Sequence, residues 1–367
     1  TYLLTRPDEN TRRLHPQAAA EAMDPKKSSF DAAVSQLVTD VTRASQRGVE
    51  TIVYFVYAGH GNVADNGEGY ITLEDARITG ADLGRVFARV PATRIHLIAD
   101  ACASYFLAYS RGPGGERRPI DSFGMVPALL TDPRVGLLLS TSSARESHEW
   151  DQFQSGVFSH EVRSGLYGAA DADGDGQVTY REIAAFVSRA NAKVPNERFR
   201  PDVHARAPRS GASTDTIIDL RRAQRRLEVD GKHAGRYFLE DSRGVRIADF
   251  HNAQGHTMQL VRPPTSLGRM YLRRLDDDKE LVVDSAPELV AIATLPAGEP
   301  RSAVRGAAHE SFNELFALPF DPQCVSDYER EHPRDPTPPS QPRDNVALMA
   351  PSSGITVRRA LGAGLVG

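Results

Sequence analysis

The sequence predicts an α/β fold: a mostly parallel sheet flanked by helices, followed by a small antiparallel β domain. Along residues 1–208, compact runs of apolar and β-branched residues alternate with segments of helical periodicity. Strands buried on both faces of a parallel sheet have this continuous apolar character, and strand–helix–strand order implies such a sheet. From about residue 215 the pattern changes to short strands between Gly, Asp and Pro turns, which predicts the β domain.

Up to residue 141, the first part is expected to contain two helices and three buried strands after a short opening strand. Ala33, Leu37 and Val41 recur at helical spacing, whereas TIVYFVYA and VGLLLST are too short and too rich in apolar residues for surface helices. The expected elements are a short strand at 2–5, helices at 30–45 and 81–89, and buried strands at 51–58, 94–99 and 135–141.

The second part is expected to be an accessory β domain over residues 215–328. Its predicted strands lie within 227–232, 236–241, 244–250, 257–263, 270–275 and 280–285, and a helix-like stretch follows at 309–318. Residues 329–367 form a proline-rich linker and tail, expected to be extended.

Composition narrows the class of protein. The chain has 367 residues, 44 basic and 48 acidic side chains and a net charge of −4, so nothing in its charge indicates a nucleic-acid partner. Its two cysteines do not make a disulfide framework and suit a reducing compartment, so we expect a cytoplasmic protein. No segment has the roughly 20 apolar residues of a membrane helix. Because the first residue is Thr1, a removed signal peptide stays open.

Reactive side chains follow two of the predicted strands. The strand at 51–58 leads into Gly59-His60-Gly61, and the strand at 94–99 leads into Asp100-Ala101-Cys102. Ligands of open α/β sheets bind at the carboxyl ends of strands, where these two ends would lie side by side. An imidazole beside a thiol promotes the thiolate and can protonate a leaving amine. The alternative is a buried cysteine with a structural histidine.

YAGHG followed by a buried strand ending in DACAS resembles the caspase-like cysteine peptidases, within them the metacaspase and bacterial caspase-like branch. The resemblance covers residues 1–208 and implies His60 as general acid/base and Cys102 as nucleophile. It also implies an oxyanion hole formed by the amides of Gly61 and Cys102. Two features depart from the family pattern: its first strand lies N-terminal to anything visible here, and Tyr105 replaces the usual glycine.

The same resemblance implies a pocket for a basic substrate side chain. The aspartate two residues before the nucleophile, Asp100, lines that pocket in the metacaspase-like branch and pairs with Arg or Lys. A buried carboxylate without a cation is costly, so the substrate would supply the counter-charge. The alternative is an aspartate held by backbone amides. Glu146, Glu149 and Trp150 lie where this fold contributes another pocket wall.

DADGDGQVTYRE, residues 171–182, fits the EF-hand calcium loop without gaps. The predicted Ca²⁺ ligands are Asp171, Asp173, Asp175, Gln177 through its carbonyl, Thr179 and Glu182. Helices are expected on both sides, at 159–169 and 180–192. The alternative is an acidic turn. Whether calcium regulates or only stabilises stays open, since EF-hands usually work in pairs.

The loop RGPGGERRPID offers Arg111, Arg117 and Arg118 as candidate processing sites, with an upstream activating protease as a partner. The alternative is a solvated charged loop.

The sequence therefore predicts a cysteine endopeptidase cleaving proteins after Arg or Lys, with calcium and no organic cofactor. By analogy with bacterial relatives, processing or calcium would activate it in stress, cell death or defence. The alternatives are an inactive caspase-like, calcium-binding scaffold and a transferase or ligase using the same dyad.

Overall fold

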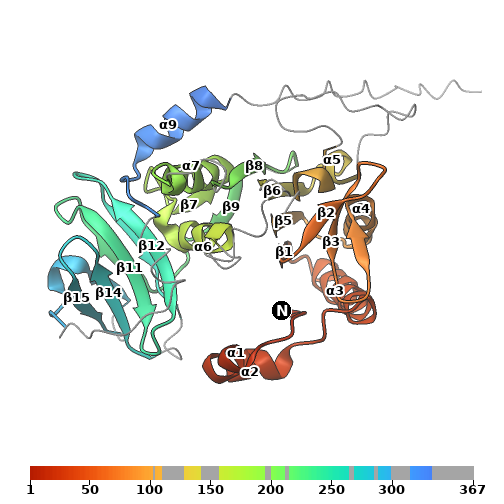
Figure 1. The fold of residues 1–367 in the computed structure, drawn as a ribbon, viewed down its shortest axis with the longest axis horizontal. Helices are drawn as coiled ribbons and strands as arrows, with labels where there is room; N and C mark the ends of the chain where they lie inside the picture. The colour runs from red at the N-terminus through yellow and green to blue at the C-terminus, as the bar shows by residue number, and fades with distance from the viewer. Residues whose placement is uncertain are drawn as a thin grey trace, which may run out of the picture.

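The computed structural model describes residues 1–101, 104–109, 128–141, 157–194, 200–210, 215–263, 268–284, 288–298 and 315–332. The fold is mixed α/β, with one helix-flanked sheet that is largely parallel and several antiparallel sheets (Figure 1). None of the helices in these ranges combines the length and the apolar character needed to cross a membrane.

The central sheet has the order β1–β5–β6–β8. Its first three strands, β1 (Ile52–Ala58), β5 (Arg94–Asp100) and β6 (Val135–Thr141), are parallel and lie where three strands were predicted. β5 is buried as expected, but the expected full burial of β1 is wrong: its residues alternate between exposed and half-buried, because it is the outer strand and one of its faces is not covered. The fourth, β8 (Asp202–Arg206), runs antiparallel to β6 and was not predicted. Within the described part of the chain, β1 is the outer strand on the other side.

Helices cover both faces of this sheet (Figure 1). On one face, α3 (Lys27–Gln46) and α4 (Gly80–Arg89) pack with Leu97 of β5. On the other, α6 (Val157–Ser164) and α7 (Tyr180–Asn191) pack with its neighbour Ile98. Successive strand residues point to opposite faces, so Asp100 lies on the α6 and α7 side.

Small elements precede and follow the first strand. The expected strand at 2–5 is only a single bridge between Leu4 and Met23, and two short helices, α1 (Glu9–Leu14) and α2 (Pro16–Glu21), lie between them. After β1 come three unpredicted strands that form an antiparallel sheet. These are β2 (Gly61–Val63), β3 (Gly69–Thr72) and β4 (Arg77–Thr79).

The short helix η1 (Ser104–Leu107), which follows the predicted nucleophile, packs closely against this region. A Cβ atom at Gly80 would lie 1.8 Å from the Leu107 carbonyl oxygen, and one at Gly69 would lie 2.4 Å from the Phe106 carbonyl carbon. Glycine at both positions therefore lets η1 approach α4 and β3. The helix α5 (Ala128–Thr131) precedes β6.

The β-rich part is built from three small sheets, and its six predicted strands are present. One sheet has the order β12–β11–β14–β15, a second the order β13–β10–β16, and β9 pairs with β7 of the first part. The pairing of β10 with β16 is parallel, so this part is not wholly antiparallel as predicted. The strands are β7 (Gln177–Thr179), β9 (Thr216–Asp219), β10 (Arg226–Val229), β11 (Gly235–Asp241), β12 (Arg246–Asn252), β13 (Met258–Val261), β14 (Met270–Arg274), β15 (Lys279–Val283) and β16 (Leu289–Ala291).

The C-terminal elements differ from the prediction. Of the helix-like stretch at 309–318, residues 315–318 are described and are not helical. A helix follows instead at α9 (Pro322–Glu331), with the side chain of Asp321 accepting a hydrogen bond from the Cys324 amide at its start. It packs against α7. A short η7 (Ile292–Thr294) follows β16.

The two parts share one hydrophobic core. Phe158 and Phe186 of α6 and α7 belong to the same buried cluster as Leu227, Phe250 and Leu272 of the β-rich part. The β-rich part therefore covers the outer side of the helices that cover the central sheet (Figure 1).

Gly80→Ala should destabilise the fold, because the added methyl group would overlap the Leu107 carbonyl oxygen. Overpacking of this kind costs about 1–3 kcal/mol in the free energy of unfolding, measurable by urea denaturation. Gly84→Ala is the matched control on the same helix, where alanine favours the helix by about 1 kcal/mol. Equal stability of Gly80→Ala and wild type would contradict the close approach of η1 to α4.

Candidate functional site

The carboxyl ends of β1 and β5 lie side by side. Ala58 is the register partner of Asp100, and the Gly59 amide donates a hydrogen bond to the Asp100 carbonyl oxygen at 3.0 Å. His60 follows Ala58 by two residues, as Cys102 follows Asp100 by two. Cys102 itself lies outside the described residues.

The backbone of His60 is held firmly while its side chain is exposed. Its carbonyl oxygen accepts hydrogen bonds from the Tyr57 hydroxyl at 2.7 Å and from the Thr72 amide at 3.0 Å. These contacts fix the turn between β1 and β2 and leave the imidazole exposed to solvent. Gly61, the predicted oxyanion donor, is the first residue of β2.

Tyr105, which departs from the family pattern, belongs to an aromatic cluster. Its ring stacks on Tyr109 with centroids 4.5 Å apart, and both rings contact the imidazole of His204 on β8, with centroids 5.0 Å and 4.4 Å away. The neighbouring Ser104 hydroxyl donates a hydrogen bond to the Ser140 carbonyl oxygen at the end of β6. The segment after the predicted nucleophile is thereby attached to β6 and β8.

Asp100 points toward the first turn of α6. One of its carboxylate oxygens accepts hydrogen bonds from the Ser159 amide at 3.0 Å and the Ser159 hydroxyl at 2.5 Å. Burial raises the pKa of the Asp100 carboxyl, while the hydrogen bonds from Ser159 and Ser140 lower it. Among the described residues no Arg or Lys side chain pairs with it. The hydrogen bond from the Ser159 amide fits the alternative hypothesis, an aspartate held by backbone amides. The lack of a cationic partner among the described residues fits the hypothesis of a pocket for a basic substrate side chain.

A second carboxyl, which the sequence did not single out, lies nearby. Glu161 of α6 is fully buried, with its carboxyl near the side-chain amide of Asn191 on α7. Burial raises the pKa of Glu161 well above its usual range; the Asn191 amide acts in the opposite direction, and the charge of Asp100 raises it further. In the sequence, SHEVRS reads as an ordinary helix before the acidic loop, so only the fold reveals this side chain.

The remaining predicted site residues lie outside the described ranges. They are Cys102, the pocket-wall candidates Glu146, Glu149 and Trp150, and the processing candidates Arg111, Arg117 and Arg118.

The acidic loop is preceded by α6 and η4 (Gly165–Ala169) and followed by α7, as predicted. Carboxylate oxygens of Asp171, Asp173 and Asp175 lie within 4.8 Å of one another. The two oxygens of Asp171 accept hydrogen bonds from the amides of Gly174 at 3.0 Å and Gly176 at 2.9 Å. Both glycines have left-handed backbone conformations, with φ of 74° and 79°.

The last predicted ligand, Glu182, lies at the start of α7. One of its oxygens accepts a hydrogen bond from the Ala172 amide at 3.0 Å, and the other accepts from the amide and hydroxyl of Thr179 at 2.8 Å. Burial raises the pKa of Asp171 to about 6; hydrogen bonding from Gly176 opposes this, and the charges of Glu182, Asp175 and Asp173 add to it. The loop thus concentrates negative charge; the charge of Arg221, which is paired with Asp219, acts on Asp175 only in part.

The short strand inside the loop, β7, pairs with β9 of the β-rich part, with Val178 opposite Ile218. A neighbouring buried contact connects the loop to the central sheet. The Tyr180 hydroxyl is hydrogen-bonded to His96 Nδ1 of β5 at 2.6 Å, and the His96 ring stacks on Tyr54 of β1 with centroids 4.8 Å apart. These contacts place the loop next to the two strands that lead to His60 and Cys102.

α6 is also tied to the β-rich part by a buried polar network. His160 Nε2 donates to the Asp249 carboxylate at 2.6 Å, and Arg163 donates to His160 Nδ1 at 2.7 Å. Arg246 Nε donates to the same Asp249 carboxylate at 2.7 Å. Burial raises the pKa of the Asp249 carboxyl, but the charge of Arg246 and the hydrogen bonds from His160 and Arg246 outweigh it and lower the pKa to about 2.

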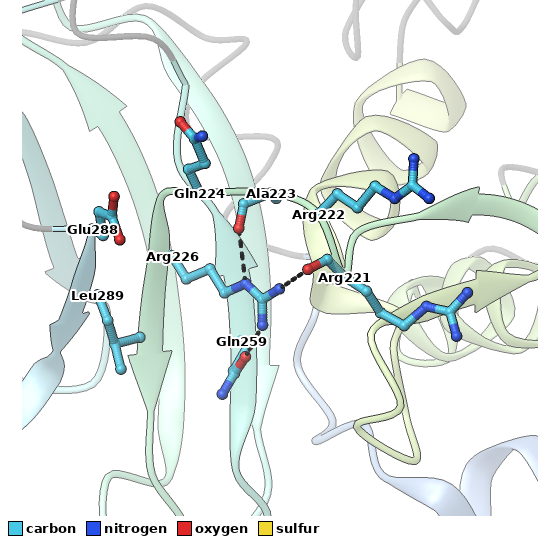
Figure 2. A pocket seen from close by; sticks show the side chains of 8 residues that line it. All are labelled: Arg221, Arg222, Ala223, Gln224, Arg226, Gln259, Glu288 and Leu289. Atoms are coloured by element: carbon cyan, nitrogen blue, oxygen red, sulfur yellow. Dashed lines mark hydrogen bonds between the residues drawn. The ribbon is translucent and has the colours of Figure 1, made fainter.

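A pocket of about 400 Å³ lies elsewhere, where β9 leads into β10 (Figure 2). Its most prominent side chain, Arg226, donates to the carbonyl oxygens of Ala223 and Arg221 and to the side-chain oxygen of Gln259. These hydrogen bonds occupy the guanidinium of Arg226. Arg226 therefore links β10 to the preceding turn and to Gln259 of β13, and it is not available to bind an anion.

No protein-family model matches the chain, and no curated protein matches it closely enough to count as a relative.

Asp249→Asn should strongly destabilise the protein at neutral pH, because Arg246 would lose its buried counter-charge. Breaking a buried pair by removing one partner costs about 3–5 kcal/mol. Asp277→Asn is the control, since Asp277 pairs with Arg274 at a more exposed turn where such a pair is worth about 0–1 kcal/mol. Denaturant unfolding of both variants measures the difference; equal losses would contradict a special role for the Asp249 network.

Proposed function

We propose that the chain is a caspase-like cysteine endopeptidase that cleaves proteins after Arg or Lys, with His60 and Cys102 as its catalytic dyad. The observation that carries the proposal is the register of β1 and β5. Ala58 faces Asp100, so the chain reaches His60 and Cys102 in the same number of residues from adjacent strand ends. The resemblance of YAGHG and DACAS to the family's two motifs supports the same assignment.

In the proposed reaction His60 accepts the thiol proton of Cys102, and the thiolate attacks the scissile carbonyl carbon. The amides of Gly61 and Cys102 stabilise the oxyanion. His60 then donates its proton to the leaving amine as the C–N bond breaks, giving an acyl-enzyme. Water, deprotonated by His60, hydrolyses the thioester and restores the thiol. The exposed side chain of His60 is consistent with this role.

Specificity for a basic residue is proposed from Asp100. Its carboxylate is partly buried and held by Ser159, and it has no cationic partner in the described part of the chain. A substrate guanidinium or ammonium would supply the missing charge through a charge-assisted hydrogen bond. Protein substrates cut after Arg or Lys follow from this chemistry.

We also propose that residues 171–182 bind one Ca²⁺ ion. The pattern of oxygen ligands, the left-handed glycines and the clustered carboxylates of Asp171, Asp173 and Asp175 support it.

The same loop favours the second candidate function, an inactive caspase-like protein that binds calcium as a scaffold. Measured turnover separates the two, and product analysis with an added amine acceptor separates hydrolysis from transfer.

Cys102→Ala and His60→Ala should each reduce cleavage of Arg-terminated fluorogenic peptides by roughly 10³-fold or more, and the double variant should be little worse than either one. Cys324→Ala is the matched control, because the other cysteine lies on α9, away from the ends of β1 and β5. Activity retained by Cys102→Ala would refute the dyad.

Calcium should raise the melting temperature, since a cation would relieve the repulsion among the loop carboxylates. At a hundredfold excess over Kd the stabilisation is about 2.7 kcal/mol. Glu182→Gln should abolish the calcium-dependent increment, whereas Asp31→Asn, which changes an exposed side chain on α3, should keep it. Calorimetry with no heat of binding at millimolar calcium would rule out the site.

A further inference from the structure

The acidic loop at residues 171–182 is held by a segment of the β-rich part. Its short strand β7 pairs with β9, and the Leu220 amide that follows β9 donates to the Gly176 carbonyl oxygen at 2.8 Å. Near the end of the loop, the Tyr180 amide donates to the Asp215 carbonyl oxygen at 2.9 Å. Strand β9 and the residues on either side of it therefore hold the second half of the loop.

A second segment of the β-rich part holds the first half of the loop. His256 Nε2, in the turn between β12 and β13, is hydrogen-bonded to the Ala172 carbonyl oxygen at 2.9 Å. A carbonyl oxygen can only accept, so Nε2 carries the proton and the imidazole is the donor. The approach is close at the middle of the loop as well, since a Cβ atom on Gly176 would lie 2.7 Å from Cγ of Arg221.

The contact with β9 orients one of the predicted calcium ligands, the carbonyl group of Gln177. Across a trans peptide bond, the C=O of one residue and the N–H of the next point in opposite directions. The Gly176 carbonyl points to Leu220, so the Gln177 amide points away from β9, and it donates to the Asp175 carboxylate at 2.7 Å. The amide and carbonyl of one strand residue point to the same side. The Gln177 carbonyl is therefore directed toward the acidic side of the loop.

The same contacts oppose opening of the ion-free loop. The carboxylates of Asp171, Asp173 and Asp175 lie within 4.8 Å of one another and repel, which favours a loosened loop. Hydrogen bonds from β9 and His256 hold its backbone in place, so less ordering is left to occur when an ion binds.

We propose that the β-rich part is the structural partner of the calcium loop. In this arrangement β9 and the 253–256 turn preorganise the loop, and bound calcium in turn fastens both segments to it. This inference rests on the proposed calcium site and deepens it by naming the part of the protein that the ion regulates. Such coupling is reciprocal: the factor by which attachment increases calcium affinity is also the factor by which calcium increases attachment.

Amide hydrogen exchange of the full chain, with and without saturating calcium, tests the proposal. Calcium should slow exchange of the Leu220 amide and of the Gly255 amide in the 253–256 turn by roughly 5-fold or more. Gly244 is the matched control, because it lies in the β11–β12 turn of the same β-rich part and has the same φ of 80° as Gly255. Its amide should exchange at the same rate in both conditions. In Glu182→Gln, calcium should affect none of the three amides.

A variant outside the predicted ligands tests the reverse direction. His256→Ala should weaken calcium binding in calorimetry by roughly 5-fold or more, and by the same factor by which calcium slows the Gly255 amide in wild type. His256→Gln keeps an N–H donor and should restore most of the affinity. Melting temperatures without calcium check that both variants are folded, and the exchange experiment on wild type does not depend on them.

The outcomes separate this inference from the calcium site itself. If calcium binds with measurable heat but slows neither Leu220 nor Gly255, or slows Gly244 equally, the inference is overturned and the calcium site stands. If His256→Ala binds calcium as wild type does, the role of the 253–256 turn is refuted. If no heat of binding is measured at millimolar calcium, the calcium site fails and the inference fails with it.

Discussion

The burial of α6 between the central sheet and the β-rich part is the constraint on which the rest of the structure depends. Three consecutive residues of this helix face different neighbours: Ser159 binds Asp100, His160 binds Asp249, and Glu161 is enclosed near α7. An eight-residue helix has little stability of its own in water, so these contacts and the shared core maintain it. The β-rich part thus supports the helix that holds the candidate pocket residue.

Much of the central sheet could be predicted from the apolar character of its parallel strands, although β1 has exposed residues along one face and is not buried like β5. β1, β5 and β6 are continuous apolar runs, and that pattern needs no knowledge of neighbours. By contrast, β8 reads DVHAR, whose polar residues give no such signal, and it is a strand only because β6 offers an antiparallel partner. The three short strands after β1 are too brief for any periodicity to appear.

The candidate site divides in the same way. His60 and Asp100 could be located because a motif follows a recognisable strand, and the register of Ala58 with Asp100 agrees with the expected neighbouring ends. Ser159 and Glu161 could not be located in this way, because they lie near Asp100 only in the folded chain and belong to a helix about 60 residues further along the sequence. The roles of Cys102, Glu146, Glu149 and Trp150 stay predictions. The sequence offered no partner strand for the acidic loop, and the structure supplies one: β7 pairs with β9 at the start of the β-rich part.

The buried imidazole of His96 has a consequence for acid tolerance. It lies between Tyr54 and Tyr180, and burial, with a smaller contribution from the charge of Arg94, lowers its pKa to about 4. An unfolded chain takes up a proton at this histidine near pH 6.5, while the folded chain resists until about pH 4. Folding therefore opposes protonation, and mild acidification weakens the native state well before any carboxylate pair is lost. Because this ring contacts both strands that lead to the candidate dyad, its protonation would weaken the packing of β1 on β5.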